Sequence, residues 1–310
     1  MILRAACLVL LAMGTADAQN ALSAISTDPA SELKPGPSSF EMAVPSHGEM
    51  LLGIFYQAAG PGRHPTVVLL HGFPGFEQNL DLAQAMRRAG WNVLALHYRG
   101  SWGVGGDFSL VHAIEDADAM VAFVRSPESA QKYHIDSDRI AVIGHSMGGY
   151  MAAWAAAHAP AVLGAVMIGS WDITEPVRGA TGSRAQLIAR ALKAEADGTE
   201  PADFLALHGY SRAKLATEIV DHREAFDLDH LAEKIAPRAV LLLTADDDSE
   251  AGSERFMSAL QATGDKKVKL LHEATDHGWS GKRIYLETLV LNWLEARFSE
   301  QIPGPPRTGN

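Results

Sequence analysis

Residues 140–149 read Ile-Ala-Val-Ile-Gly-His-Ser-Met-Gly-Gly, so a serine flanked by glycines follows an apolar run. The apolar run predicts a strand, and the alanine-rich stretch Met147–His158 predicts a helix. A serine at so sharp a strand-to-helix turn has a strained backbone, and side chains two residues to either side would collide, which explains Gly144 and Gly148. The turn would hold the Ser146 hydroxyl at the helix N-terminus, where developing negative charge is favoured. We therefore predict that Ser146 is a catalytic nucleophile.

Strand and helix patterns alternate on both sides of this turn. The first two strand candidates predict a hairpin, and later ones are short apolar runs typical of strands buried on both faces. The alternation predicts an α/β fold with a mostly parallel eight-stranded sheet flanked by helices. The candidate strands are Phe40–Val44, Met50–Tyr56, Thr66–Leu70, Trp91–Leu96, Arg139–Ile143, Gly164–Ile168, Ala239–Thr244 and Lys267–Leu271. The candidate helices are Asn79–Ala89, Val111–Arg125, Met147–His158, Ser253–Ala262 and Arg283–Phe298.

Residues 171–237 interrupt this alternation because they contain no convincing strand. Helix-like stretches occur at Ala185–Ala196 and Ser211–Glu224. A structureless loop of this length is improbable inside a compact domain, so we predict a helical cap or lid inserted after one of the later strands. The insertion, together with Trp102 and Trp171, is expected to shape an apolar pocket.

The turn His71-Gly-Phe-Pro-Gly75 closes the strand candidate Thr66–Leu70. Acyl-transfer enzymes with a serine elbow take one oxyanion donor from the residue after the nucleophile and a second from a loop after an earlier strand. The backbone N–H of Met147 is therefore the first predicted donor, and that of Phe73 is the second. Pro74 has no N–H and cannot serve.

A general base and an acid should follow the nucleophile in chain order. His277 follows the last strand candidate and precedes the final helix, so it is the predicted base. Asp246-Asp-Asp248 follows the strand candidate Ala239–Thr244, and a carboxylate from this run would hold the imidazole in the correct tautomer. Asp172 is a rival acid. The acidic run lacks ligands at the spacing of a metal site, so no metal is expected.

Composition and charge exclude several classes of protein. The chain has 310 residues, of which 47% are hydrophobic and 20% are charged, which is ordinary for a globular protein. A formal net charge of −11 has the wrong sign for binding a phosphate backbone, so nucleic acid is not an expected partner. Nothing in the sequence favours one oligomeric state.

The N-terminus predicts export from the cytoplasm. Arg4 precedes an apolar stretch too short to span a bilayer, and Ala16-Asp-Ala18 follows, which matches the three zones of a secretory signal peptide. We predict that residues 1–18 are removed and that the mature protein is secreted or periplasmic. The cleavage would also remove Cys7, the single cysteine.

The remaining chain divides into three parts by composition. Residues 19–38 are small, polar and proline-rich and predict a flexible leader, whereas residues 299–310 predict a flexible tail. Residues 39–298 would form one catalytic domain, because the candidate catalytic residues lie on both sides of the insertion. No segment of the mature chain reaches the ~18 apolar residues of a membrane span.

These motifs, in this order, resemble the α/β-hydrolase superfamily over about Phe40 to Phe298. The resemblance implies Asp248 as the acid, since the third residue after the turn position, here Ala245, usually holds that role in the fold; Asp247 and Asp172 remain rivals. Tyr98-Arg-Gly-Ser-Trp-Gly103, with Glu115-Asp116 downstream, is similar to the catalytic domain of prolyl-oligopeptidase-type peptidases and related esterases. Those peptidases carry an N-terminal propeller, for which the residues before the first strand are too few.

The expected activity is hydrolysis of carboxylic esters through a Ser146–His277–Asp248 triad and an acyl-enzyme intermediate, without a cofactor. The expected substrate is a small-molecule ester or a short peptide-like compound. Cleavage of aminoacyl or peptide amides by an exopeptidase is the alternative. A non-catalytic binding protein on the same scaffold is a third possibility, because a fold does not determine a function.

Overall fold

Eight strands form one sheet, as the sequence predicts. The computed structural model describes residues 21–29, 33–198 and 205–299. Strands β1 and β2 pair antiparallel, β2 pairs antiparallel with β4, and all other neighbours are parallel, in the order β1-β2-β4-β3-β5-β6-β7-β8. The strands are β1 Ser38–Ser46, β2 Glu49–Gln57, β3 His64–Leu70, β4 Asn92–Leu96, β5 Ile135–His145, β6 Val162–Ile168, β7 Ala239–Thr244 and β8 Val268–His272.

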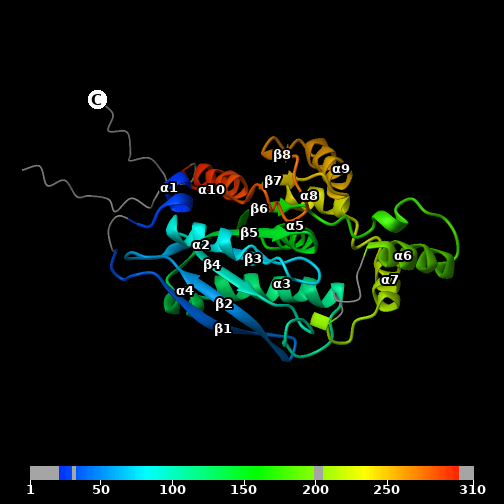
Figure 1. The fold of residues 1–310 in the computed structure, drawn as a ribbon, viewed down its shortest axis with the longest axis horizontal. Coiled ribbons are helices and arrows are strands. Elements are labelled where there is room, and N and C mark those ends of the chain that lie inside the picture. The colour runs from blue at the N-terminus through cyan, green and yellow to red at the C-terminus, as the bar shows by residue number, and fades with distance from the viewer. Residues whose placement is uncertain (1–20, 30–32, 199–204, 300–310) are drawn as a thin grey trace, which may run out of the picture.

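Helices cover both faces of this sheet (Figure 1). Side chains alternate along a strand, so Val142 of β5 joins one hydrophobic core and its neighbour Ile143 joins the other. Helices α1 Ala21–Ser26, α2 Leu80–Arg88 and α10 Arg283–Ser299 complete the core that contains Ile143. The opposite core includes residues of α3 Leu110–Arg125, α4 Pro127–Lys132, α5 Met147–His158, α8 Ala232–Ile235 and α9 Ser249–Ala262. Burial on both faces explains why the central strands read as uninterrupted apolar runs.

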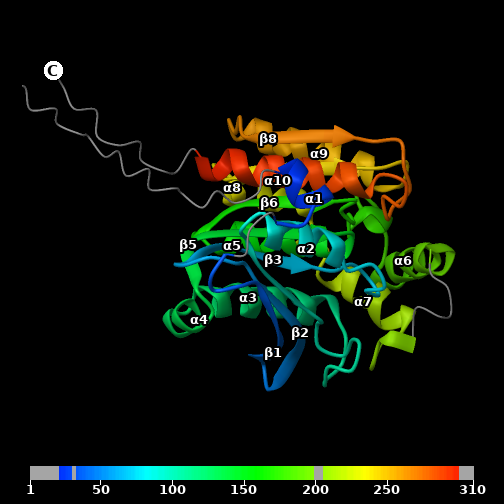
Figure 2. The same cartoon turned by 60° about the vertical axis from the view of Figure 1, so that its left-hand side comes forward.

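The predicted insertion forms two helices that project beyond the layers. Between β6 and β7 lie α6 Arg184–Gly198 and α7 Arg212–Asp221, with the short turns η1 Glu175–Val177 and η3 Leu228–Leu231. Figures 1 and 2 show α6 and α7 side by side at the end toward which strands β3 and β8 point. Turn η3 and helix α8 instead pack against α5 and α9, so the projecting cap is narrower than residues 171–237.

Two further features of the fold differ from the sequence prediction. Residues 21–26, expected within a flexible leader, form helix α1, because Ala24 is fully buried where α1 packs against α10 and α2. Helix α4, which begins after the N-cap Ser126, was not predicted. The predicted signal peptide and nearly all of the predicted tail lie outside the described residues. Within the described part of the chain, no helix is long and apolar enough to cross a membrane.

A buried ion pair anchors the loop that follows β4. Arg99 donates from Nε to one carboxylate oxygen of Asp116 at 2.7 Å and from its backbone N–H to the other at 2.7 Å. The Ser46 hydroxyl also donates to Asp116, at 2.6 Å. The Asp116 side chain is fully buried, so its partners replace the hydration that it gives up.

Replacing Asp116 with alanine should destabilise the protein by about 3–5 kcal/mol, because the buried Arg99 guanidinium would lose its buried counter-charge and keep only the more exposed Glu115. Urea unfolding followed by circular dichroism measures this change in the free energy of unfolding. Asp221→Asn is the control, since it breaks an exposed ion pair with Arg184 between the cap helices and should leave the unfolding midpoint unchanged. Equal midpoints for Asp116→Ala and the unmodified protein would contradict the assignment.

Candidate active site

Ser146 occupies the strained turn between β5 and α5 that the sequence predicts. Its φ is 56° and its ψ is −121°, a backbone conformation that residues with a side chain rarely adopt. A Cβ atom on Gly144 would overlap the backbone of Gly148, and a Cβ on Gly148 would overlap the carbonyl of Leu70. Both glycines are therefore required by close backbone approach, and the turn exposes part of the Ser146 side chain.

His277 follows β8 and contacts a carboxylate that follows β7. His277 Nδ1 donates to Asp247 Oδ2 at 2.6 Å. The other oxygen, Oδ1, accepts from the backbone N–H of Ser249 at 2.8 Å and from its hydroxyl. Burial opposes ionisation of Asp247, but the bonds from His277 and Ser249 outweigh it and hold the pKa of this carboxyl below its usual range.

The carboxylate that contacts His277 belongs to Asp247 and not to Asp248, which the sequence analysis expects as the acid. The backbone N–H of Asp247 donates to the carbonyl of Ala245 at 2.7 Å, and this tight turn directs the second aspartate of the run toward His277. Asp248 becomes the exposed N-cap position of α9, and its side chain makes no capping hydrogen bond. The residue that faces His277 is therefore the second after Ala245 and not the expected third, because this turn is one residue shorter than the resemblance implies.

Asp172, the other rival acid, belongs to a separate cluster of charges. Both of its carboxylate oxygens accept from Arg178, at 2.8 and 3.0 Å, and one of them also contacts Arg255. Arg178 further binds Asp227 at 2.9 Å. This buried carboxylate is therefore occupied in joining the segment after β6 to α9 and η3.

Ser146, His277 and Asp247 meet at the end of β6. The Ser146 backbone N–H donates to the carbonyl of Ile168 at 2.8 Å. A Cβ atom on the next residue, Gly169, would lie 3.2 Å from two atoms of the His277 ring and 3.4 Å from Asp247 Oδ2. Among the described residues no hydrogen bond within 3.5 Å joins the Ser146 hydroxyl to His277, a contact that commonly tightens only when substrate binds.

The turn after β3 lies directly against Ser146. A Cβ atom on Gly72 would be 2.9 Å from Ser146 Cβ. In the part of the chain that is described, the backbone N–H groups of Phe73 and Met147 donate to no protein acceptor. The two predicted oxyanion donors are thus adjacent to Ser146 and available to a ligand.

Two buried histidines, His71 and His145, support these segments. His145 Nε2 donates to the carbonyl of His277 at 2.9 Å, and the two rings are 4.6 Å apart. Burial lowers the pKa of His145 to about 4 and that of His71 to about 3. Both imidazoles are therefore neutral near pH 7.

Aromatic side chains from three other segments surround Phe73 on the cap side. Its ring centroid lies 5.6 Å from that of Phe108, 5.2 Å from Tyr210 and 6.4 Å from Trp171. Trp171 thus lies where the sequence analysis expects an apolar pocket, whereas Trp102 lies on a more exposed part of the same region. Phe108 and Tyr210 were not predicted, because neither belongs to a periodic pattern.

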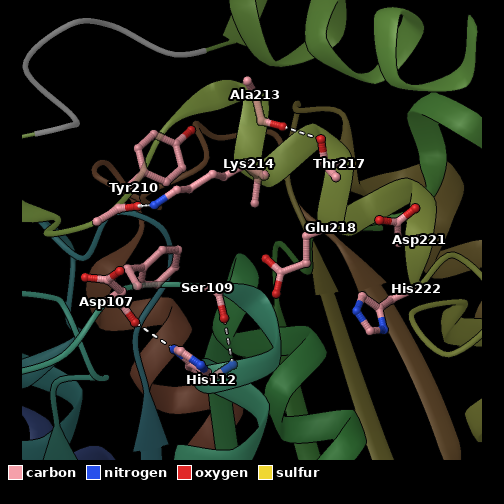
Figure 3. Close-up of a pocket in the computed structure, with 13 residues that line it drawn as sticks. Asp107, Ser109, His112, Tyr210, Ala213, Lys214, Thr217, Glu218, Asp221 and His222 are labelled. Carbon is pink, nitrogen blue, oxygen red and sulfur yellow. Dashed lines mark hydrogen bonds between the residues drawn. The ribbon is translucent and has the colours of Figure 1, made fainter. Parts of the chain in front are cut away.

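A cavity of about 590 Å³ separates the cap helix α7 from the start of α3 (Figure 3). Phe108 and Tyr210 line it and also contact Phe73, so the cavity adjoins the aromatic cluster. Glu218 of α7 spans it, because its carboxylate accepts from the backbone N–H groups of Leu110 and Val111, each at 2.9 Å. The cap is therefore bound to the N-terminus of α3 by an interaction that the helix dipole strengthens.

Across the described ranges, no three His, Cys, Asp or Glu side chains form a metal-binding group.

The fold and this site together define a class of protein. A mostly parallel sheet carries a serine at a strand-to-helix elbow, and an aspartate and a histidine follow from later strand ends, which is the arrangement of an α/β-hydrolase. Residues 67–281 match the sequence model of the alpha/beta hydrolase family. The chain belongs to this family.

Known relatives agree with this class. The chain is 28% identical to acylamino-acid-releasing enzyme 1 of rice over an alignment of 138 residues, which covers 39% of this chain but only 18% of that enzyme. An esterase of Pyrococcus furiosus matches with a TM-score of 0.59 at 18% identity, over 84% of this chain and 91% of the esterase. An esterase of Pyrobaculum calidifontis matches with a TM-score of 0.61 at 19% identity, over 89% and 88%.

A puromycin hydrolase has the same fold, with a TM-score of 0.61 at 18% identity over 90% of this chain and 42% of that protein. At these identities the solved structures demonstrate a shared fold and no particular substrate. Together with the family match, the relatives support a hydrolase.

The two buried histidines predict a loss of stability in acid. The unfolded chain would protonate them near pH 6.5, whereas the folded protein keeps them neutral down to about pH 4 for His145 and about pH 3 for His71. The unfolded state therefore binds more protons below pH 6.5. The contribution of the two neutral imidazoles to the free energy of unfolding should be fully present above that pH. Toward pH 4 the free energy of unfolding should fall by about 1.4 kcal/mol per pH unit for each histidine.

Urea unfolding between pH 7 and 4.5 measures this slope. His145→Gln retains a donor for the His277 carbonyl but cannot titrate, so the slope should fall by about one proton. An unchanged slope in this variant would show that His145 is not kept neutral by burial.

Proposed function

We propose that the protein is a serine hydrolase that cleaves carboxylic esters, with Ser146 as nucleophile, His277 as general base and Asp247 as the acid. The observation that carries this proposal is the 2.6 Å bond between His277 Nδ1 and Asp247 beside the Ser146 elbow. That bond leaves Nε2 of His277 as the nitrogen that can accept a proton from the serine hydroxyl.

Acylation follows from these positions. His277 Nε2 takes the Ser146 hydroxyl proton as Oγ attacks the ester carbonyl, and the N–H groups of Phe73 and Met147 bind the resulting oxyanion. The imidazolium then gives the proton to the departing alcohol. Asp247 stabilises the positive charge that the imidazole carries in between. Water enters, and His277 deprotonates it as its oxygen attacks the acyl carbon. Collapse of this second tetrahedral intermediate breaks the bond to Oγ and releases the carboxylic acid, and the imidazolium returns its proton to Ser146 Oγ.

Amide cleavage is the second candidate, and the similarity to the rice acylamino-acid-releasing enzyme favours it. An amide requires the same nucleophile, but His277 must protonate a poorer leaving group. The esterases share the fold over more of their length, and for this reason ester cleavage is the first proposal. On the basis of the N-terminal sequence, we also propose that the enzyme acts outside the cytoplasm, after cleavage behind Ala18.

A fluorophosphonate probe should label the protein at Ser146, because only an activated serine attacks such a probe readily. Turnover of p-nitrophenyl esters should exceed that of aminoacyl p-nitroanilides, and Ser146→Ala should abolish both labelling and turnover. Faster anilide cleavage would select the peptidase alternative. Absence of any labelling would instead indicate a binding protein on a hydrolase scaffold.

The identity of the catalytic acid is tested by making the same aspartate-to-asparagine substitution at two adjacent positions. Asp247→Asn should lower kcat by a factor on the order of 10³–10⁴, because the neutral amide favours the wrong imidazole tautomer. Asp248→Asn, at the exposed position, should leave kcat within about twofold. Thermal unfolding of both variants checks that they are folded. The opposite order of effects would restore Asp248 as the acid.

A further inference from the structure

The oxyanion loop, residues 71–76, is held by side chains from the segment that follows β4. The Tyr98 hydroxyl donates to the carbonyl of His71 at 3.1 Å, and the Trp102 indole Nε1–H donates to the carbonyl of Pro74 at 2.7 Å. Between them, His71 Nδ1 donates to the carbonyl of Gly72 at 2.7 Å. Carbonyls on both sides of Phe73 are therefore fixed.

The direction of the Phe73 N–H depends on these bonds. In a trans peptide the N–H points away from the carbonyl, so the bond to the Gly72 carbonyl turns the Phe73 N–H to the opposite side. The Trp102 bond then restrains the chain beyond Phe73, at Pro74. Without it, the hydrogen bonds that hold the loop carbonyls within the described part of the chain would all lie on the Gly72 side of Phe73.

Trp102 itself has an unusual backbone. Its φ is +49°, which is uncommon for a residue other than glycine and costs free energy that the surroundings must supply. Its backbone N–H donates to the carbonyl of Ala206 in the returning cap segment at 2.9 Å, and Ser101 forms a β-bridge with Leu207. The same residue thus touches the cap through its backbone and the oxyanion loop through its side chain.

The oxyanion loop is shaped to receive this indole ring. A Cβ atom on Gly75, whose φ is +104°, would lie 2.7 Å from Trp102 Nε1 and 2.7 Å from the His71 ring. The indole also stacks on His97 at 5.9 Å and meets Phe76 edge-on at 5.1 Å. With 36% of Trp102 exposed, core packing alone does not account for these contacts.

We propose that Trp102 is a positioning residue for the oxyanion hole, which connects the cap to the Phe73 donor. This inference rests on the proposed acyl-transfer function. The indole N–H restrains the Pro74 carbonyl, the restrained loop keeps the Phe73 N–H directed at the oxyanion, and the cap segment at Ala206 keeps Trp102 in its strained backbone conformation.

The test is Trp102→Phe, which retains an aromatic ring but removes the N–H. Loss of a whole oxyanion donor costs on the order of 10²–10³ in kcat, so a loosened donor should cost about tenfold. We expect kcat to fall by about tenfold with KM within about twofold. The inhibition constant of a trifluoromethyl ketone, whose hemiketal oxygen occupies the oxyanion hole, should rise by the same factor as kcat falls.

Trp154→Phe is the matched control. The Trp154 indole N–H donates to Asp118 at 3.2 Å in a half-buried position on the α3–α5 side of the sheet. The control loses the same kind of bond far from the oxyanion loop. It should keep kcat and the inhibition constant within about twofold, and thermal unfolding should change similarly in both variants.

Three results would overturn the inference. Trp102→Phe could behave like the control, could raise KM with kcat unchanged, or could lower kcat without weakening ketone binding. The second result would make Trp102 a substrate-binding surface instead. Failure of the proposed function itself is distinguishable, because then the unmodified protein would turn over neither esters nor anilides and no probe would label Ser146.

Discussion

The contact between the Ser146 turn and the end of strand β3 is the constraint on which the catalytic arrangement depends. Gly148, in the first turn of α5, approaches the Leu70 carbonyl too closely for any side chain, and Gly72 lies against Ser146 in the same way. Interiors packed this densely do not deform gradually. A larger residue at either glycine would separate α5 from β3 and with them the Met147 and Phe73 N–H groups. These two packing contacts therefore determine the positions of both the proposed nucleophile and its proposed oxyanion donors.

Parallel pairing explains how residues far apart in the chain reach that contact. Strands β5, β6, β7 and β8 are neighbours in sequence order, so their carboxyl ends lie along one edge of the sheet. Ser146, Gly169, Asp247 and His277 each follow one of these ends. Strand positions were predictable because burial on both faces demands continuous apolar runs. Helix α1 was not, because six residues carry too little periodicity, and its stability comes from packing Ala24 against distant helices.

Prediction from the sequence was less successful where backbone geometry, and not residue type, decides which side chains come into contact. Three consecutive aspartates are chemically equivalent in the sequence, and only the tight turn from Asp247 N–H to the Ala245 carbonyl decides which one faces His277. The same limitation applies to the aromatic cluster, in which Phe73 meets Tyr210 across 137 positions of the chain. Contacts of such separation have no local signal. The positions of Ser146 after β5 and of His277 after β8, in contrast, could be predicted because their neighbours on the chain constrain them.

The environments of the two candidate carboxylates explain why Asp247, and not Asp172, suits the imidazole. Asp172 is bonded to Arg178 and Arg255, so much of its negative charge is already compensated. A carboxylate already paired with two guanidinium groups would stabilise a further positive charge on an imidazole only weakly. Asp247 is bonded instead to the neutral amide and hydroxyl of Ser249, which orient the carboxylate and stabilise its ionised form without neutralising it. Its charge is therefore available to the imidazolium that the proposed mechanism forms on His277.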